Sequence, residues 1–212
     1  MVAGKPLLAW TIEEAKRCSS LTKYAVSTDD LEIKVLAEAY GVALPFMEPF
    51  SDGTNPLIER IQYVVRTLEE RGESYDIIAD IRATGPLKLA SDIDGMVEML
   101  VTSHADVVCG VSKLEDHHPA RIKLRLENGR LVDIWPEPRS GLRQDLTPPV
   151  FIRNGSCYVV WVAALMRGIH FQASEADVRG FEMPAERSVN VDSEMDLLLC
   201  GLLLQRREKN LA

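Results

Sequence analysis

The chain has 212 residues, 46% of them hydrophobic and 26% charged, and its formal net charge is −8. This balance is typical of a globular protein with one core, so we expect a single domain over residues 1–212. The negative charge excludes the broad basic surfaces that nucleic acids and anionic membranes bind, and we expect neither as a partner. The longest apolar runs are far shorter than the ~20 residues that cross a bilayer.

Four cysteines are scattered along the chain, at Cys18, Cys109, Cys157 and Cys200. Their spacing is not that of metal ligands, and each lies in an apolar or helical stretch. We therefore expect reduced, buried thiols, which favour a cytoplasmic location.

Helical periodicity alternates with short β-prone runs through the first half of the chain. The expected helices cover residues 6–18, 31–40, 56–71 and 91–103, the last capped by Ser91 or Asp92. The expected strands cover residues 23–27, 42–46, 75–81 and 105–111, and residues 48–55 form a polar loop. This alternation predicts a doubly wound α/β fold with a mostly parallel sheet.

The second half begins with a hairpin signal. Asn128-Gly129 lies between two β-prone runs, residues 121–126 and 131–134, and is typical of a tight two-residue turn. A stretch rich in proline and arginine follows, and then an apolar run over residues 151–162. We interpret residues 117–155 as an excursion from the sheet, because they hold too few apolar residues for a separate core. A short strand at 188–191 and a helix at 193–207 complete the prediction.

Ligands of open α/β sheets bind beyond the carboxyl ends of the strands, so the segments after each strand are candidate sites. Ser27–Asp30 follows one strand, but these residue types also cap helices well. Arg82–Lys88 follows another strand and carries two cations. A structural turn would use Gly85 and a proline there, but it has no need of both cations, which suit phosphate or carboxylate.

The excursion holds further candidates. His117 and His118 are adjacent and would face opposite ways on a strand, so hydrogen bonding to a polyol or structural packing is expected in place of metal binding. An arginine–amide cluster brackets the proline-rich loop and consists of Arg139, Arg143, Gln144, Arg153, Asn154 and Gly155. It could hold a carboxylate bidentately, or it could be a solvated loop paired with Glu137 and Asp145.

Asp192 has two interpretations. Ser193 and Asp196 have the spacing of a capping box at the start of the last helix, so this acidic cluster could serve the helix alone. Alternatively, Asp192 ends a strand and ligates Mg²⁺ that bridges phosphate oxygens.

Seven segments in register resemble the acylneuraminate cytidylyltransferase family, which includes the synthetases of CMP-activated sialic and related nonulosonic acids. They are GKPLLAWTIEEA, AVSTDD, DIRATGPLK, DHHPAR, RQDL, IRNGSCY and RSVNVDSEMDL, and they extend over nearly the whole chain. The resemblance implies a Rossmann-like fold and a homodimer built partly from the hairpin excursion. It also implies transfer of CMP from CTP to the anomeric hydroxyl of a sugar acid, with Mg²⁺ and release of pyrophosphate.

The same resemblance implies roles for individual residues. The nucleotide would contact Ser27, Asp29, Arg82, Thr84, Gly85 and Lys88. The sugar acid would contact His117, His118, Arg143, Gln144, Arg153, Asn154 and Gly155. Catalysis would depend on Arg82, Lys88 and Asp192, and the metal would be held by Asp192 and Asn190.

The chain departs from the family pattern at its start. Family members begin with a strand and a loop of the type ARGGSKGIPRKN, whereas Met1 stands just before the first helix. We therefore expect weak CTP binding. We also expect strands 23–27 and 75–81 to be neighbours across a gap, or to be patched by another segment or chain. Arg82 stands where many family members have glutamine. Asn190 stands where the sialic-acid synthetases usually have the first of two aspartates that bind the metal.

The alternative is a non-catalytic homologue that serves as a sugar-binding or partner subunit. A third, more remote alternative is a sugar-nucleotide glycosyltransferase, a class of enzyme that can have a similar sheet. An in-frame strand and basic loop upstream of Met1 would favour the enzyme, and a stop codon there would favour the partner subunit.

Overall fold

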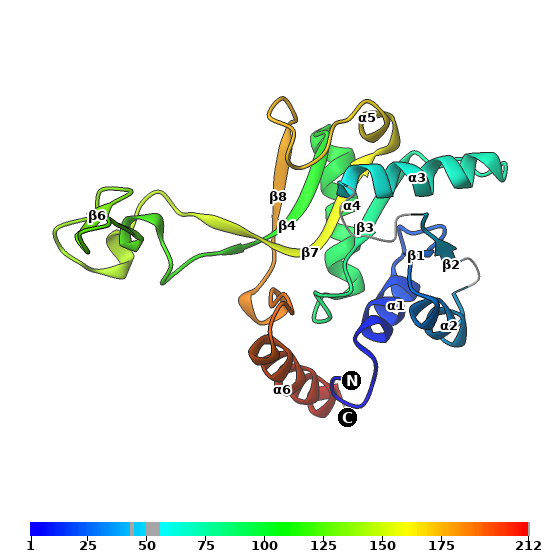
Figure 1. Cartoon of the computed structure of the whole chain (residues 1–212), viewed down its shortest axis with the longest axis horizontal. Coiled ribbons are helices and arrows are strands. Elements are labelled where there is room, and N and C mark those ends of the chain that lie inside the picture. The colour runs from blue at the N-terminus through cyan, green and yellow to red at the C-terminus, as the bar shows by residue number, and fades with distance from the viewer. Residues whose placement is uncertain (43–44, 50–55, 212) are drawn as a thin grey trace.

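A four-stranded sheet forms the centre of the protein (Figure 1). The computed structural model describes residues 1–42, 45–49 and 56–211. In spatial order the strands are β3 (Ile77–Ile81), β7 (Phe151–Trp161), β4 (Val107–Lys113) and β8 (Val178–Glu182). β7 runs antiparallel to β3 and β4, whereas β4 and β8 are parallel. The predicted α/β class is confirmed, with β7 as an antiparallel strand inside the sheet.

A second, two-stranded sheet lies at the N-terminal side. It consists of β1 (Val26–Thr28) and β2 (Pro45–Met47), which are parallel. In the part of the chain that the structure describes, β1 pairs with β2 alone and β3 with β7 alone, so no strand connects the two sheets there. The expectation that β1 and β3 are neighbours across a gap stays a prediction. The strand predicted at 42–46 begins later, and residues 43–44 and 50–55 of the predicted strand and loop lie outside the described residues.

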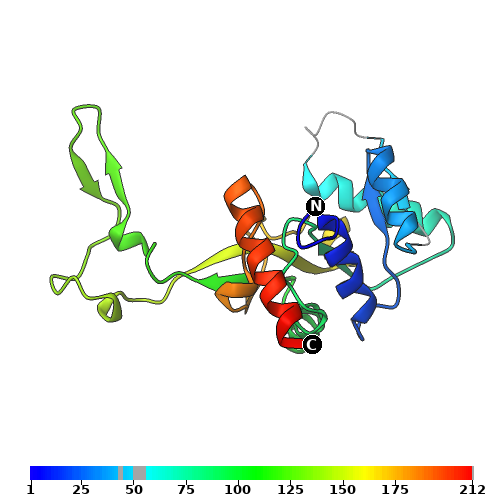
Figure 2. The same ribbon diagram turned by 90° about the horizontal axis from the view of Figure 1, so that it is seen from below.

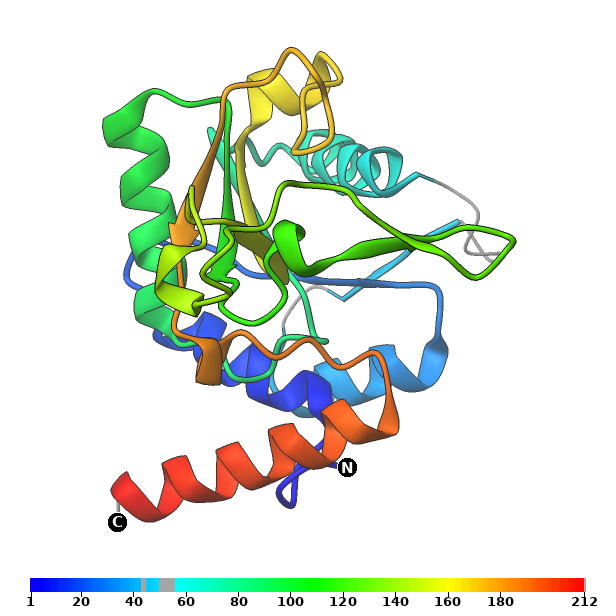
Figure 3. The same ribbon diagram turned by 90° about the vertical axis from the view of Figure 1, so that its left-hand side faces the viewer.

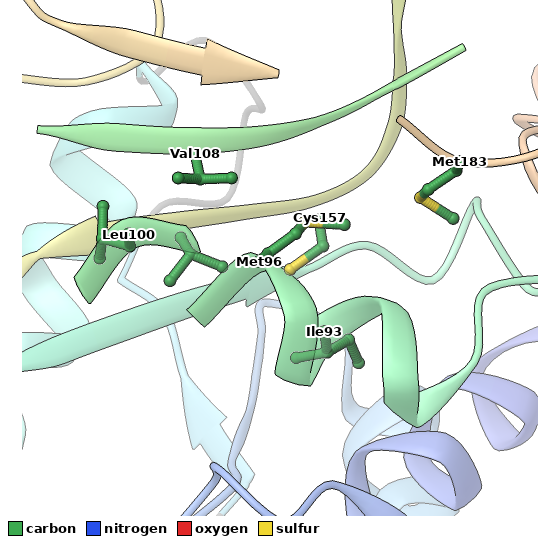
Figure 4. Close-up of a cluster of buried hydrophobic side chains, with 7 residues drawn as sticks. Ile93, Met96, Leu100, Val108, Cys157 and Met183 are labelled. Carbon is green, nitrogen blue, oxygen red and sulfur yellow. The ribbon is translucent and has the colours of Figure 1, made fainter. Parts of the chain in front are cut away.

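Helices cover both faces of the central sheet. On one face, α4 (Ala90–Ser103) packs through Ile93, Met96 and Leu100 onto Val108, Cys157 and Met183 (Figure 4). On the other face, α3 (Leu57–Glu70) and α5 (Val162–Met166) pack through Val65 and Leu165 onto Val107 and Val160. Alternate residues of a strand face opposite sides, so β4 and β7 supply apolar side chains to both layers.

Two helices pack beside the small sheet, and a third packs against the N-terminal segment. They are α1 (Leu7–Arg17), α2 (Leu31–Ala39) and α6 (Glu194–Leu211). Trp10 of α1 packs with Cys200 and Leu204 of α6, which places these two helices side by side (Figures 2 and 3). No helix in the described ranges is long and apolar enough to cross a membrane.

The predicted hairpin is present and extends away from the body of the protein (Figure 1). Its strands are β5 (Lys123–Arg125) and β6 (Leu131–Asp133), joined through the Asn128-Gly129 turn. The short helices η1 (Pro119–Arg121) and η2 (Arg143–Asp145) flank it. The excursion therefore joins the ends of β4 and β7, as the sequence predicts.

Two local predictions are wrong. Residues 188–191 are not a strand; they follow the short helix η3 (Ala185–Arg187), and the edge position is taken by β8, whose side chains are largely exposed and give no apolar signal. Neither Ser91 nor Asp92 caps α4, because the helix begins at Ala90. Asp92 acts from the first turn, where its carboxylate accepts the Leu89 amide proton at 2.9 Å.

Candidate functional site

The side chain of Lys88 holds the loop after β3 through hydrogen bonds to its backbone. Its side chain is fully buried, and its ammonium group donates to the carbonyls of Arg82 and Gly85, both at 2.6 Å, and to Thr11 Oγ1 at 3.0 Å. Burial lowers the pKa of Lys88 to about 8. A ligand-facing role for Lys88 was predicted, but all three donors bind the protein itself. The charge therefore shapes the loop and does not face a ligand.

Arg82 and Asp80 form an ion pair at the end of β3. Arg82 Nε lies 2.9 Å from Asp80 Oδ2, and both side chains are partly exposed. Burial raises the pKa of Asp80, and the Arg82 charge opposes that shift. Lys88 of the same loop is buried, so Arg82 is the loop cation that reaches the surface. Its partner Asp80 is a charged residue in an otherwise apolar strand.

An aromatic–arginine platform lies beside this pair. Tyr158 of β7 stacks on Phe171 with ring centres 4.1 Å apart, and the Arg153 guanidinium lies 4.6 Å from the centre of the Phe171 ring. His170 meets Phe171 edge-on at 5.7 Å. Burial raises the pKa of Tyr158, opposed by the charges of Arg153 and Arg82. The positive charges of Arg153 and Arg82 therefore both favour the ionised form of the Tyr158 hydroxyl.

A small pocket opens between this platform and α3. Asp80, Tyr158, His170 and Phe171 supply its polar and aromatic wall. Apolar side chains supply the rest, namely Leu57, Ile58, Ile61, Val107, Val160 and Leu165. Its free space of about 20 Å³ holds about one water molecule and is too small for a sugar, so the pocket is a gap in the packing between α3 and the sheet.

The segment with Asn190 and Asp192 is fixed to the Arg82–Lys88 loop. The Val191 amide donates to the Thr84 carbonyl at 2.8 Å. Asn190 Nδ2 donates to Asp192 Oδ2 at 2.5 Å, while Asn190 Oδ1 is buried and accepts no hydrogen bond. These contacts bring the predicted metal residues next to the predicted phosphate loop.

The capping box at the start of α6 is formed without the carboxylate of Asp192. Asp196 Oδ2 accepts from the Ser193 amide at 2.9 Å and from Ser193 Oγ at 2.7 Å, and the Asp196 amide approaches Ser193 Oγ at 3.3 Å. Only the backbone amide of Asp192 joins this network. The capping-box interpretation is therefore confirmed for Ser193 and Asp196. The Asp192 side chain is exposed, and metal binding by it stays a prediction.

Three residues predicted to contact the sugar acid are structural. His118 is 2% exposed, with Nδ1 accepting from the Ala120 amide and Nε2 3.0 Å from the Pro148 carbonyl. Asn154 is also buried, and its amide group is satisfied by Ser156, Ser188 and Met183. Gly155 has φ +68°, and a side chain there would meet Asn190. These positions hold the chain in place, so direct ligand contact by His118 and Asn154 is contradicted.

The predicted arginine–amide cluster is divided in space. Arg143 lies in η2 of the excursion and pairs with Glu115 and Asp116, each at 3.0 Å. Gln144 and His117 are exposed in the same excursion. Arg153 instead belongs to β7 and reaches the aromatic platform. Within one chain, Arg143 and Arg153 do not form the bidentate pair that the sequence suggested.

The end of β1 is connected to the site through α3. Ser27 Oγ donates to Glu48 Oε1 at 2.7 Å, and Glu48 forms an ion pair with Arg60 of α3. The Arg60 charge in turn acts on Asp80 of β3. Asp29 is exposed beside Asp30, which caps α2. Of the predicted nucleotide residues, Arg82, Thr84 and Gly85 share one loop, whereas Ser27 lies on the second sheet.

Asp80, Tyr158, His170 and Phe171 were not predicted as site residues from the sequence. The signal for Asp80 was available, since it is a charged residue inside a buried strand. Tyr158 lies in an apolar run that indicates only a core strand. Its stacking with Phe171 depends on the turn made by α5, which periodicity does not predict.

An α/β sheet with an arginine-bearing loop at the carboxyl end of a strand is typical of the class of folds that bind nucleotides at that edge of the sheet. Comparison identifies the family within it. The cytidylyltransferase family profile matches residues 1–124, more than half of the chain, so the chain belongs to the cytidylyltransferase family.

Curated relatives narrow the comparison. The CMP-N,N'-diacetyllegionaminic acid synthase of Legionella pneumophila is 25% identical over all of this chain and 90% of its own length. The pseudaminic acid cytidylyltransferase of Campylobacter jejuni is 26% identical over 68% of this chain and 62% of its own length. The N-acylneuraminate cytidylyltransferase A of Danio rerio is 28% identical over 92% of this chain, which spans 44% of that relative.

Solved structures confirm the fold. The CMP:2-keto-3-deoxy-manno-octonic acid synthetase complexed with CTP superposes with a TM-score of 0.71 at 16% identity, over 98% of this chain and 90% of that one. A 4-diphosphocytidyl-2C-methyl-D-erythritol synthase superposes with a TM-score of 0.66 at 16% identity, over 96% and 90%. At these identities the likeness supports the fold alone.

Proposed function

We propose that the protein transfers CMP from CTP to a nonulosonic-type sugar acid and releases pyrophosphate. The observation that carries this proposal is the joining of the Arg82–Lys88 loop to the Asn190–Asp192 segment by the Val191–Thr84 hydrogen bond. The aromatic–arginine platform lies beside that loop. The groups proposed to bind phosphate, metal and sugar would thus lie close together, as in-line attack on the α-phosphorus requires.

The sugar acid would be held by the platform. Arg153 and Arg82 offer guanidinium donors to its carboxylate, and the Tyr158–Phe171 stack offers an apolar surface to its ring or acyl groups. His170 and Asp80 lie beside the platform and can hydrogen-bond to hydroxyl groups. The nucleotide would lie along Arg82, Thr84 and Gly85, toward Ser27 and Asp29.

Mg²⁺ is proposed at Asp192 and Asn190. Magnesium binds through one or two carboxylates and completes its shell with water and substrate phosphates. The exposed Asp192 carboxylate would be such a ligand. Asn190 donates to it through Nδ2, and its buried Oδ1 would bind the ion after the amide group turns. Within the described ranges, His, Cys, Asp and Glu side chains form no cluster of three that could hold a metal without substrate. The ion would neutralise charge on the phosphates as pyrophosphate leaves.

A homodimer through the excursion is part of the proposal. The excursion exposes large apolar side chains, including Leu124, Leu131, Ile134, Trp135, Leu142, Phe151 and Ile152, each between 42% and 60% exposed. Such a surface on a projecting arm is suited to a partner subunit. A partner's arm could bring Arg143, Gln144 and His117 to the site that they do not reach within one chain. Free cysteines accord with a cytoplasmic location.

The alternative is a non-catalytic homologue that binds the sugar acid. Incubation with CTP, Mg²⁺ and a panel of nonulosonic acids, followed by mass spectrometry, separates the two. A CMP-linked sugar acid supports the enzyme. The enzyme proposal is overturned in favour of the binding subunit if the protein binds a sugar acid but forms no CMP-linked sugar. This result must hold for the 212-residue chain and for any longer protein encoded in frame by the gene.

A further inference from the structure

Helix α4 begins beside a buried carboxylate that binds an arginine from a distant part of the chain. Asp92 is 2% exposed and accepts two hydrogen bonds from Arg187, one from Nε at 3.0 Å and one from Nη2 at 2.7 Å. Its Oδ2 also accepts the Leu89 amide proton at 2.9 Å. A two-bond arginine–carboxylate pair fixes direction as well as distance. Arg187 lies in η3, 95 residues after Asp92, so this pair determines where a remote segment of the chain lies.

The segment after Arg187 is attached to the candidate site by weaker contacts. Ser188 Oγ accepts from Asn154 Nδ2 at 3.1 Å. The Val191 amide donates to the Thr84 carbonyl at 2.8 Å. These are single hydrogen bonds between neutral groups, whereas the Arg187 pair is bidentate and ionic. Among these contacts, Arg187 therefore makes the strongest one.

Asp92 connects both parts of the candidate site to the core. Through the Leu89 amide it holds the end of the Arg82–Lys88 loop, and through Arg187 it holds the segment that leads to Asp192. Asp92 is itself fixed, because the apolar face of α4 packs onto the central sheet (Figure 4). Burial makes an ion pair costly to desolvate, so stability alone is a weak reason for it. What the pair supplies is a fixed geometry between the loop and the segment.

We propose that Arg187 is a positioning residue, which through Asp92 sets the place of the Asn190–Asp192 segment against the Arg82–Lys88 loop. This inference rests on the proposed function, which assigns the metal to the segment and the nucleotide to the loop. Asp92 occupies both Nε and Nη2 of Arg187, so Arg187 acts through the segment that it holds. A misplacement of about 1 Å at a reacting site can lower a rate about a hundredfold.

The test is amide hydrogen exchange at Val191, measured by NMR on the chain of residues 1–212 with neither CTP nor Mg²⁺ present. The Val191 amide donates to the Thr84 carbonyl, so its exchange reports the contact between segment and loop. In Arg187→Met we expect exchange at Val191 to be faster by about tenfold or more, because the segment opens locally. Exchange at Leu100, in the buried face of α4, should change by a smaller factor.

Arg17→Met is the matched control. Arg17 pairs at 2.7 Å with Glu14, a second buried carboxylate, which also accepts the Ala90 amide proton at the start of α4 at 2.9 Å. This variant takes an arginine away from a buried acid but leaves the Asn190–Asp192 segment untouched. Exchange at Val191 should therefore not change.

Two further variants cover the case in which Arg187→Met does not fold. Asp92→Asn retains an oxygen for the Leu89 amide, and it should speed exchange at Val191 as Arg187→Met does. Arg187→Lys retains the charge but not the two-bond fork, so exchange should return only part of the way to the wild-type rate.

Turnover gives a second measurement, made on a form of the protein that releases pyrophosphate. Arg187→Met should raise the half-saturating Mg²⁺ concentration by about tenfold, as the loss of a group that orients a metal ligand does. The KM for the sugar acid should change much less, because the sugar acid is held elsewhere.

Unchanged exchange at Val191 in folded Arg187→Met or Asp92→Asn overturns the proposal. Equal acceleration at Val191 and Leu100 also overturns it, because Arg187 would then serve general stability. So does a wild-type Mg²⁺ requirement in a variant with faster exchange. If every wild-type form fails to release pyrophosphate, that result counts against the proposed function, and exchange at Val191 still decides the role of Arg187.

Discussion

The guanidinium of Arg153 lies 4.6 Å from the ring centre of Phe171, on a ring that also stacks against Tyr158. The contact orders an arginine that would otherwise be a mobile surface side chain, and cation–π contacts of this kind contribute about 0.5–2 kcal/mol. A pre-ordered guanidinium loses less entropy when it binds a carboxylate. The platform is therefore the strongest structural support for a sugar-acid site.

Replacing Arg153 with alanine should raise the KM for the sugar acid by about tenfold or more, which corresponds to about 1.4 kcal/mol of binding, and should change the KM for CTP much less. The reason is that the carboxylate belongs to the sugar. Arg179→Ala on β8, which removes an exposed arginine paired with Asp177, is the control. Equal effects on both substrates, or no effect, would remove Arg153 from the site.

Asp192 and Asp196 offer a matched pair of variants. Asp192→Asn removes a charge that no described helix cap uses, so turnover should fall by orders of magnitude with an almost unchanged melting temperature. Asp196→Asn weakens the capping box and should cost about 0.5–1 kcal/mol of stability with normal turnover. Initial rates across a Mg²⁺ titration and melting curves decide between the roles. If Asp192→Asn lowers the stability of the protein but leaves turnover normal, Asp192 does not bind the metal.

The buried ammonium of Lys88 should make stability depend on pH in the alkaline range. Its pKa is lowered from 10.5 to about 8 on folding, so between these values the unfolded chain binds more protons than the native one. The free energy of unfolding therefore rises as pH increases through this window, by at most about 3 kcal/mol.

Urea unfolding of wild type and Lys88→Met from pH 7 to pH 10 isolates this contribution. The substitution should lower stability at pH 7, because two carbonyls lose their donor. The difference between the two proteins should widen with pH. A constant difference across the range would mean that Lys88 keeps its proton in the folded protein throughout.

CTP should bind weakly to the chain of residues 1–212. Within the loop after β3, Lys88 is used internally and Arg82 is already paired with Asp80. A triphosphate thus finds little net positive charge in a protein of charge −8. Calorimetry with Mg²⁺ should give a dissociation constant weaker than about 1 mM. Micromolar binding would show that the described residues suffice for the nucleotide.

The elements with strong local signals were predictable. The alternation of helices and strands, the Asn128-Gly129 hairpin and the Ser193–Asp196 capping box all depend on residues close in sequence. β8 was missed because an exposed edge strand such as Val178–Glu182 lacks apolar alternation. Its place beside β4 is fixed by pairing partners about 70 residues away.

The site was predicted less well, because the sequence gives a side chain's charge but not its direction. Lys88 was expected to face a ligand, yet Thr11 and two loop carbonyls hold it inside. His118 binds the Pro148 carbonyl, 30 residues away, for a similar reason. Tyr158 appears in sequence as a core residue, and only folding brings Phe171 onto its ring.

The most direct test of the central claim is pyrophosphate release that requires CTP, Mg²⁺ and a sugar acid together. The assay uses the 212-residue chain, any longer in-frame product of the gene, and the Asp192→Asn form of each, with nonulosonic acids and with a neutral sugar as control. We predict release with a nonulosonic acid from a form that binds CTP, none with the neutral sugar, and near-complete loss in the Asp192→Asn version of that form. Two results would contradict the account: pyrophosphate release that does not depend on the sugar acid, or no pyrophosphate release from any form that binds both substrates.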